Sequence, residues 1–135
     1  MDDKPCILIV DDETANIRLL SHTLKPLYTV YSAANGQDAL AAAEKYLPDL
    51  ILLDIVMPEM DGFEVLTALK SSAKTNHIPV IFLTSKNDPE SETKGLNLGA
   101  DDYIFKPFSQ SLLLKRVEIH LLLSKVKDQE FDDGK

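Results

Sequence analysis

Cysteine and tryptophan are almost absent from this chain of 135 residues, which contains one cysteine, Cys6, and no tryptophan. A single cysteine excludes an internal disulfide framework and any cysteine-based zinc site of the usual four-ligand kind. Cys6 is therefore expected to be a small core residue rather than a redox sensor, in a protein that resides in a reducing cytoplasm.

Basic residues are also few, since 14 Lys and Arg stand against 22 Asp and Glu, which gives a net charge of −8. That charge repels the phosphate backbone of DNA and anionic membrane surfaces, so direct nucleic-acid binding is disfavoured. No stretch approaches the roughly 18 consecutive apolar residues of a membrane span, and the N-terminus lacks the features of a signal peptide. The sequence thus predicts a soluble, unexported protein without membrane insertion.

The length favours a single domain, because typical domains contain roughly 100–200 residues. We expect that domain to span residues 4–127. Residues 128–135 are acidic and poor in apolar groups, so we expect them to form a disordered tail or the start of a linker.

Strand-like and helix-like segments alternate along the chain. Five short apolar runs have the length of strands: Cys6–Val10, Tyr28–Ala33, Leu50–Leu53, Val80–Leu83 and Tyr103–Phe105. Between them apolar residues recur with helical spacing, as at Ile17, Leu20 and Leu24. Continuous apolar strands need two dry faces, and parallel strands need crossovers, so the pattern predicts an α/β fold with helices on both faces of a parallel sheet.

The helix expected after the fourth strand has clear end signals but little apolar surface. Asp88 and Pro89 are typical of a helix start, and Gly99 is typical of a helix end. Only Leu96 and Leu98 are large apolar residues within it, so we expect burial to hold this helix weakly and the helix to be mobile.

Polar residues follow most of the predicted strands at their carboxyl ends, where open parallel sheets bind ligands. These are Asp11, Asp12 and Glu13 after the first strand, Asp54 after the third, Thr84 and Ser85 after the fourth, and Lys106 and Pro107 after the fifth. Singly, each has an ordinary explanation, such as a helix cap for Asp11 or Asp12 and a turn for Asp54. Together, the carboxylates repel one another unless a cation neutralises them, and their hard oxygen ligands favour Mg²⁺.

An Asp beside Mg²⁺, with a Lys and a Thr directed at the same point, is what aspartyl phosphorylation requires. Asp54 is already ionised near neutral pH and could attack phosphorus without a general base. Mg²⁺ and the Lys106 ammonium would share the phosphoryl charge, and Thr84 would donate a hydrogen bond to a phosphoryl oxygen.

Four motifs in this order closely resemble the receiver domain of two-component response regulators. They are Leu8–Glu13, Asp49–Gly62, Phe82–Ser85 and Gly99–Pro107. The resemblance extends from Lys4 to Lys127. It implies a flavodoxin-like, doubly wound (βα)5 fold with a five-stranded parallel sheet in the order 2-1-3-4-5.

The resemblance also implies a role for each matching residue. Asp54 falls on the phosphorylated aspartate, Asp12 on the direct Mg²⁺ ligand, Asp11 on an acid that acts through water, and Val56 on a residue whose backbone carbonyl binds the metal. Thr84 and Tyr103 match the switch residues, Lys106 matches the family lysine, and Lys106-Pro107 matches a bond that is usually cis.

The implied function is a phosphorylation-dependent switch rather than an enzyme for other substrates. It would catalyse its own phosphorylation and dephosphorylation, with a histidine kinase or a phosphotransfer protein as its partner. Val56, Lys86 and Ser85 lie at positions that vary in the family, so the lifetime of the phosphorylated state does not follow from the sequence. Because the core residues are all present, a degenerate receiver that signals without phosphate is disfavoured.

Two other functions share parts of this pattern. A flavodoxin-like nucleotide-binding module needs a Ser/Thr/Gly-rich phosphate loop after the first strand, where Asp11-Asp12-Glu13 would repel phosphate. A phosphatase of the haloacid-dehalogenase type normally has a second acid two residues after the nucleophile, where this chain has Val56.

The last helix, expected from about Ser109 to Lys127, carries two apolar stripes. Leu113, Val117 and Leu121 could face the sheet, while Leu112, Ile119, Leu123 and Val126 lie on another side. This second stripe is either part of a wide core face or a partner surface. A partner surface would serve a homodimer through the fourth helix, fifth strand and fifth helix, or a coiled coil to an effector domain. The helix resembles those that join receivers to cyclic-di-GMP enzymes or sensor kinases.

The three histidines, His22, His77 and His120, show no metal-ligand spacing and are expected at the surface or in helix packing.

Overall fold

The structure is a computed structural model that describes residues 4–133, with side chains described as far as residue 126. Strands and helices alternate through the chain: β1 Cys6–Val10, α1 Thr14–Leu24, β2 Thr29–Ala33, α2 Gly36–Tyr46, β3 Leu50–Leu53, α3 Gly62–Lys70, β4 Val80–Thr84, α4 Pro89–Asn97, β5 Asp102–Phe105 and α5 Gln110–Asp133. Each predicted strand is present, with bounds that differ by at most one residue at either end.

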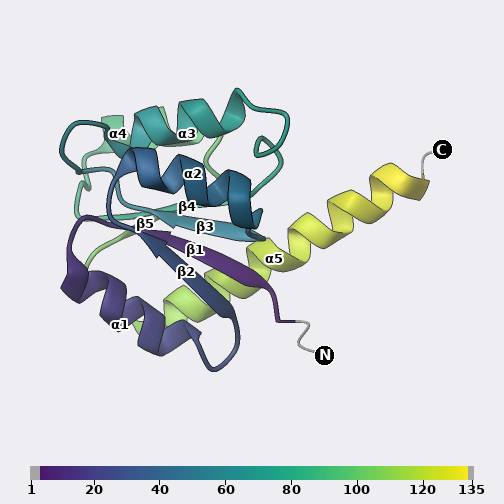
Figure 1. The fold of residues 1–135 in the computed structure, drawn as a ribbon, viewed down its shortest axis with the longest axis horizontal. Helices are drawn as coiled ribbons and strands as arrows, with labels where there is room; N and C mark the ends of the chain where they lie inside the picture. The colour runs from purple at the N-terminus through teal and green to yellow at the C-terminus, as the bar shows by residue number, and fades with distance from the viewer. Residues whose placement is uncertain (1–3, 134–135) are drawn as a thin grey trace.

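All five strands are parallel and lie in the order β2-β1-β3-β4-β5. Helices α1 and α5 cover one face of the sheet, and α2, α3 and α4 cover the other (Figure 1). The prediction of a flavodoxin-like, doubly wound fold in the order 2-1-3-4-5 is therefore confirmed.

Two apolar cores result from this layering, because alternate residues of each strand point to opposite faces. Leu8 and Val10 of β1 pack with α2 and α3, whereas Ile7 and Ile9 pack with α1 and α5. Each of these four side chains is at most 1% exposed. Since both faces of β1, β3 and β4 are dry, their sequences read as continuous apolar runs.

The helix end signals are confirmed at α4, where the Asp88 side chain accepts a hydrogen bond from Ser91 N and Gly99 has a φ of 110°. The buried residues of α4 are the small Ser91 and Gly95, and Leu96 is 45% exposed. Little apolar surface therefore holds this helix, and its mobility remains a prediction. At α1 the capping expectation is wrong, because Glu13 occupies the N-cap position without a side-chain cap bond.

Helix α5 is longer than the sequence analysis predicted, since its backbone continues to Asp133 instead of ending near Lys127. The backbone of residues 128–133 is helical, residues 134–135 lie outside the described residues, and the expectation of a disordered tail or the start of a linker stays a prediction. Of residues 128–133 only Gln129 and Glu130 have good helix propensity, so the helical backbone there extends the turns before it, which costs less than starting a new helix. The division of the chain at residue 127 remains a prediction.

Within residues 4–133, no helix is both long and apolar enough to span a bilayer.

Candidate functional site

The polar residues singled out in the sequence meet at the carboxyl edge of the sheet, because each follows directly on a paired strand. Asp54 N donates to Val10 O at 3.0 Å, and Asp11 N donates to Ala33 O at 3.2 Å. Lys106 N donates to Thr84 O at 2.8 Å. These hydrogen bonds continue the sheet pairing one residue beyond the strands. The paired backbone therefore fixes the positions of the Cα atoms of Asp11, Asp54 and Lys106.

Three carboxylates form a cluster at this edge. One carboxylate oxygen from each of Asp11, Asp12 and Asp54 lies within 4.8 Å of the others. Asp11 is 2% exposed and Asp54 is 7% exposed, whereas Asp12 faces solvent. The Oδ1 atom of Asp54 is buried without a hydrogen-bond partner in the described part of the chain. A buried carboxylate oxygen normally has a partner, so this atom and the hard oxygen donors around it fit a divalent cation such as Mg²⁺.

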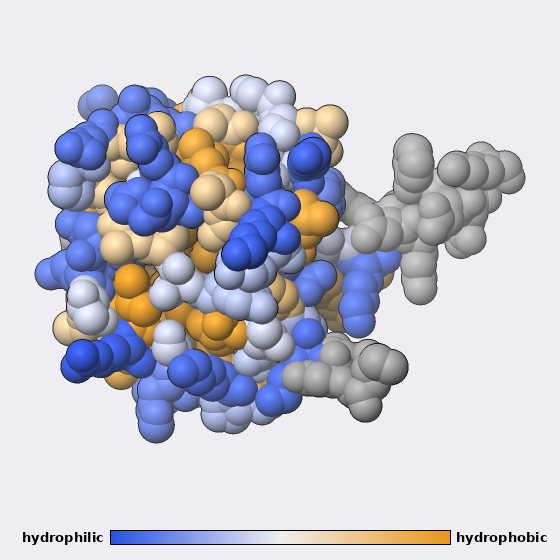
Figure 2. Space-filling view, in the orientation of Figure 1, coloured by the Kyte–Doolittle hydropathy of each residue, from blue (hydrophilic) through white to orange (hydrophobic). Residues whose placement is uncertain are grey.

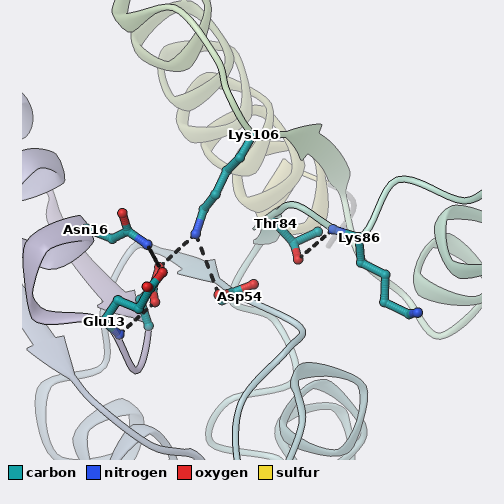
Figure 3. Close-up of polar contacts among 7 residues, drawn as sticks. Glu13, Asn16, Asp54, Thr84, Lys86 and Lys106 are labelled. Atoms are coloured by element: carbon teal, nitrogen blue, oxygen red, sulfur yellow. Dashed lines mark hydrogen bonds and ion pairs between the residues drawn. The ribbon is translucent and has the colours of Figure 1, made fainter.

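Lys106 reaches across the site and contacts two of the acids (Figure 3). Its Nζ atom lies 2.9 Å from Asp11 Oδ2 and 3.6 Å from Asp54 Oδ2. Burial works against the ammonium charge, but Asp11 and Asp54 outweigh it and raise the pKa of Lys106. For Asp54, burial is the strongest influence and raises its pKa, although Thr84 and Lys106 partly oppose this. The Lys106-Pro107 peptide bond is cis, as predicted.

Thr84 and Tyr103 are both linked to the backbone of Lys86, in the loop between β4 and α4. Thr84 is fully buried, and its hydroxyl accepts a hydrogen bond from Lys86 N at 3.3 Å. The Tyr103 hydroxyl donates to the Lys86 carbonyl at 2.5 Å. Burial raises the pKa of Tyr103 to about 12, so this phenol is a donor at neutral pH. The Lys86 side chain itself points away from the site (Figure 3).

The structure adds two residues whose part in the site the sequence analysis missed. Asn16 donates to Asp11 Oδ2 at 3.2 Å and to Glu13 Oε1 at 2.8 Å, which orients the buried acid. Gly62 N donates to Ile55 O at 2.8 Å, and a Cβ atom at Gly62 would collide with the Asp54 carbonyl oxygen. The spacing of Asn16, one helical turn after Asp12, could have suggested its role, whereas no local signal in the sequence marks the close approach of the backbone at Gly62.

Val56 is 57% exposed, and metal binding by its carbonyl remains a prediction.

A second polar cluster joins β5 to α5. Asp102 accepts hydrogen bonds from Arg116 Nη1 at 2.8 and 2.9 Å, and its Oδ2 atom lies 3.0 Å from His120 Nε2. Burial opposes the charge of Asp102, but the hydrogen bonds from Arg116, Tyr103 N and His120 prevail and lower its pKa. His120 thus takes part in helix packing, as expected, while its acidic partner was not predicted.

Replacing Asp102 with asparagine is expected to lower the free energy of unfolding at pH 7 by about 1–3 kcal/mol, because it weakens a charged hydrogen-bond cluster with limited solvent access. The lowered pKa means that ionised Asp102 stabilises the folded state above about pH 4, the ordinary aspartate value, and that this contribution is lost as the pH falls through the folded pKa. Urea unfolding followed by circular dichroism at several pH values measures both effects. Glu118→Gln alters an exposed pair with Lys115 and is expected to change stability by less than about 0.5 kcal/mol. Equal effects of the two variants would contradict the role of Asp102.

The outer stripe of α5 is solvent-exposed. Leu112 is 39% exposed, Ile119 41%, Leu123 52% and Val126 45%. Leu113 and Val117 are fully buried against the sheet, and Leu121 packs beside them, as predicted. The interpretation of the outer stripe as part of a wide core face is therefore wrong.

Comparison with known proteins agrees with this geometry. Residues 7–118 match the family model of the response regulator receiver domain. A probable cyclic di-GMP phosphodiesterase of Vibrio cholerae is 51% identical over 90% of this chain, and the response regulator PleD of Caulobacter vibrioides is 46% identical over 82%. The chain spans only 28% and 25% of the length of these relatives.

Among solved structures, a CheY-like response regulator receiver domain protein from Methanospirillum hungatei superposes with a TM-score of 0.87. It is 32% identical, and the match covers 93% of this chain and 99% of that one. The nucleotide-binding and phosphatase alternatives are not favoured by these matches. The chain belongs to the response regulator receiver domains of two-component systems, and it is a phosphoacceptor switch.

Proposed function

We propose that Asp54 takes a phosphoryl group from a histidine kinase or a phosphotransfer protein. The observation that carries this proposal is the Asp54 carboxylate, which is buried at the sheet edge while its Oδ1 atom lacks a partner among the described residues. In the transfer, an Asp54 oxygen bonds to phosphorus as the phosphorus–nitrogen bond of phosphohistidine breaks, and the imidazole takes up a proton. This chain would promote its own phosphorylation and dephosphorylation and act on no other substrate.

The acidic cluster supports Mg²⁺ as the cofactor. Asp12, Asp54 and the Val56 carbonyl would bind the ion directly, and Asp11 would bind it through water. When bound, Mg²⁺ supplies positive charge that offsets the carboxylates and the incoming phosphoryl oxygens.

Lys106 and Thr84 would bind the phosphoryl group once it is on Asp54. Lys106 is already 3.6 Å from Asp54 Oδ2, so its ammonium needs only a small shift to contact a phosphoryl oxygen. The Thr84 oxygen accepts a bond from Lys86 N, which leaves the hydroxyl proton for donation to a phosphoryl oxygen. Movement of Thr84 toward the phosphoryl group would alter the Lys86 backbone, to which Tyr103 is also bonded.

The output would be a change in the surface formed by α4, β5 and α5. Helix α4 follows the Lys86 loop directly and buries only small residues, so a modest difference in contacts can shift its position. A homodimer through this surface is one use of the change, with Leu112, Ile119, Leu123 and Val126 as the candidate interface.

The larger context belongs to the proposal as well. We infer a cytoplasmic receiver domain over residues 4–127, without direct nucleic-acid contact, which can form part of a longer regulator. The similarity to a probable cyclic di-GMP phosphodiesterase supports an effector that makes or degrades this nucleotide, with a hybrid kinase as the other option.

Lys106→Ala is expected to keep the fold and the labelling of Asp54 but to lose the surface change. The reason is that Lys106 is the cation that joins Asp54 to β5. NMR amide shifts of α4 and β5, measured with Mg²⁺ and with or without beryllofluoride, a phosphoryl mimic, would report the response. Lys115→Ala removes an exposed lysine and should respond like the wild type. An unaltered response of Lys106→Ala would remove Lys106 from the relay.

A further inference from the structure

Asn16 reaches the acidic cluster from the first turn of α1. Its Nδ2 atom donates to Asp11 Oδ2 at 3.2 Å and to Glu13 Oε1 at 2.8 Å. A reversed amide would set its oxygen against these two carboxylate oxygens, so the chemistry of the partners fixes which end of the amide faces them. Both N–H bonds of the Asn16 amide are therefore directed at acids.

The Asp11 carboxylate is almost saturated with hydrogen bonds. Its Oδ1 atom accepts from Glu13 N at 3.0 Å, and its Oδ2 atom accepts from Lys106 Nζ at 2.9 Å as well as from Asn16. An ionised carboxylate has about four acceptor positions, so these donors leave about one of them for a further partner. One position suits an acid that binds a metal ion through a bound water. Asp12 differs, since its side chain faces solvent and forms no hydrogen bond within the described residues.

Lys106 and Asn16 hold the same Asp11 oxygen from different elements (Figure 3), since Lys106 follows β5 and Asn16 belongs to α1. Among the described residues, Lys106 would be the only side-chain donor left to Asp11 if Asn16 were removed. Its charge would then draw the carboxylate toward β5. A second lysine could oppose this pull, but it would repel a cation, whereas an amide adds no charge. Asn16 thus balances Lys106 without adding positive charge to a cation site.

The start of α1 lacks the cap that a helix normally has. Glu13 occupies the N-cap position without a side-chain cap bond, because its side chain is bonded to Asn16 and its N–H is bonded to Asp11. Helix α3, by contrast, starts with a full capping box between Asp61 and Glu64. A missing cap lowers the stability of a helix, and proteins commonly break such local rules where function requires it. The polar groups at the start of α1 therefore serve the acidic cluster rather than the helix.

We propose that Asn16 is a positioning residue for the metal ion, which holds Asp11 in the orientation from which this acid binds Mg²⁺ through water. This role rests on the proposed binding of Mg²⁺ by the acidic cluster. The strands end at the left-hand edge of Figure 1, and the same edge is largely hydrophilic in Figure 2, which leaves the cluster open to ions from solvent. Removing a residue that orients a metal ligand commonly changes metal affinity by about 10- to 100-fold. Since Asp11 keeps its bonds to Lys106 and Glu13 N, we expect the lower end of that range, about tenfold.

The first test is Mg²⁺ binding to the unphosphorylated protein. Titration with magnesium chloride, followed by the NMR amide shifts at the carboxyl ends of β1 and β3, gives the dissociation constant. Asn16→Leu has a side chain of similar size without a donor and should raise this constant about tenfold. Glu13→Ala leaves the bond between Asn16 and Asp11 in place and removes an exposed, screened charge, so it should raise the constant by less than about threefold.

Asn35→Leu is the matched control. Asn35 donates to Asp38 Oδ2 at 3.0 Å and caps α2, so this variant loses an amide–carboxylate hydrogen bond of the same kind together with a helix cap. In urea unfolding it should lose at least as much stability as Asn16→Leu. It should nevertheless bind Mg²⁺ like the wild type, which separates an effect on stability from an effect on metal binding.

The second test separates metal binding from phosphoryl transfer. With a small acyl phosphate as the donor, Asn16→Leu should need about ten times more Mg²⁺ for half-maximal labelling of Asp54. Its labelling rate at saturating Mg²⁺ should stay within about twofold of the wild type, because only the binding of the ion is weakened. A general disturbance of the site would lower the saturating rate as well.

Three results would overturn the role of Asn16 and leave the Mg²⁺ site in place. These are equal dissociation constants for the wild type and Asn16→Leu, an equal loss of affinity in Asn35→Leu, and an equal loss in Glu13→Ala, which would assign the effect to Glu13. A wild type that binds no Mg²⁺ would instead contradict the proposed cofactor, and the role of Asn16 with it.

Discussion

Asp54→Ala is expected to reduce phosphoryl labelling from near stoichiometric to background. The Asp54 carboxylate is the group proposed to bond to phosphorus, and neither Asp11, held by Lys106, nor the solvent-facing Asp12 occupies its position beside Thr84. Intact-mass spectrometry after incubation with Mg²⁺ and a small acyl phosphate measures the added group. Asp38→Ala removes an exposed aspartate at the start of α2 and should label like the wild type.

The same substitution should make the apoprotein more stable. Burial raises the pKa of Asp54 above its ordinary value, so keeping this carboxylate ionised costs the folded state free energy at neutral pH. Removing the charge is expected to raise the free energy of unfolding by about 1–2 kcal/mol, as is common when a functional residue under strain is replaced. Stoichiometric labelling of Asp54→Ala would place the phosphorylated residue elsewhere, and a loss of stability would show that packing at Asp54 outweighs its charge.

Gly62→Ala is expected to damage both the fold and the site. A Cβ atom there would collide with the Asp54 carbonyl oxygen and lie 2.7 Å from Ile55 Cα. Backbone atoms cannot rotate away as a side chain can, so either α3 or the loop that carries Asp54 must move. We expect a loss of about 3 kcal/mol in the free energy of unfolding and, for the fraction that remains folded, labelling that is slower by about 100-fold.

Gly36→Ala is the comparison variant, because the three atoms nearest to its added Cβ all belong to the side chain of Met60, with the sulfur at 2.6 Å and Cβ and Cγ at 2.8 Å, and none belongs to the backbone that carries Asp54. Met60 is only partly buried, so its sulfur and Cγ can rotate away, while its Cβ can yield only by a small shift of the Met60 backbone. This variant should lose less stability and label at the wild-type rate. If the two glycine variants behaved alike, the close approach of α3 to Asp54 would not be what positions the acid.

The fold and most of the site could be predicted because both depend on local patterns. The continuous apolar runs of β1, β3 and β4 arise from burial on both faces, and burial on both faces implies parallel strands with helical crossovers. Once the strands are parallel, residues that follow them must meet at one edge. Asp11, Asp54, Thr84 and Lys106 were therefore placed together without knowledge of any contact.

Local composition was a weaker guide. The acidic segment after Lys127 suggested a disordered tail or the start of a linker, and the backbone of α5 continues through it to Asp133, because extending a formed helix costs less than starting one. The capping role considered for Asp11 or Asp12 at α1 failed, and Asp11 instead accepts bonds from Lys106, Asn16 and Glu13 N.

The sequence by itself determined the layer order and the strand-end cluster of Asp11, Asp54, Thr84 and Lys106, because hydrophobic periodicity and strand polarity are properties of neighbouring residues. Only the tertiary structure decided that Lys106 lies closer to Asp11 than to Asp54, and that Arg116 and His120 share Asp102. The packing also decided which apolar face of α5 is buried and which is exposed. The physical reason is that partners distant in the chain compete for the same group, and distances of a few tenths of an ångström, set by packing, decide between them.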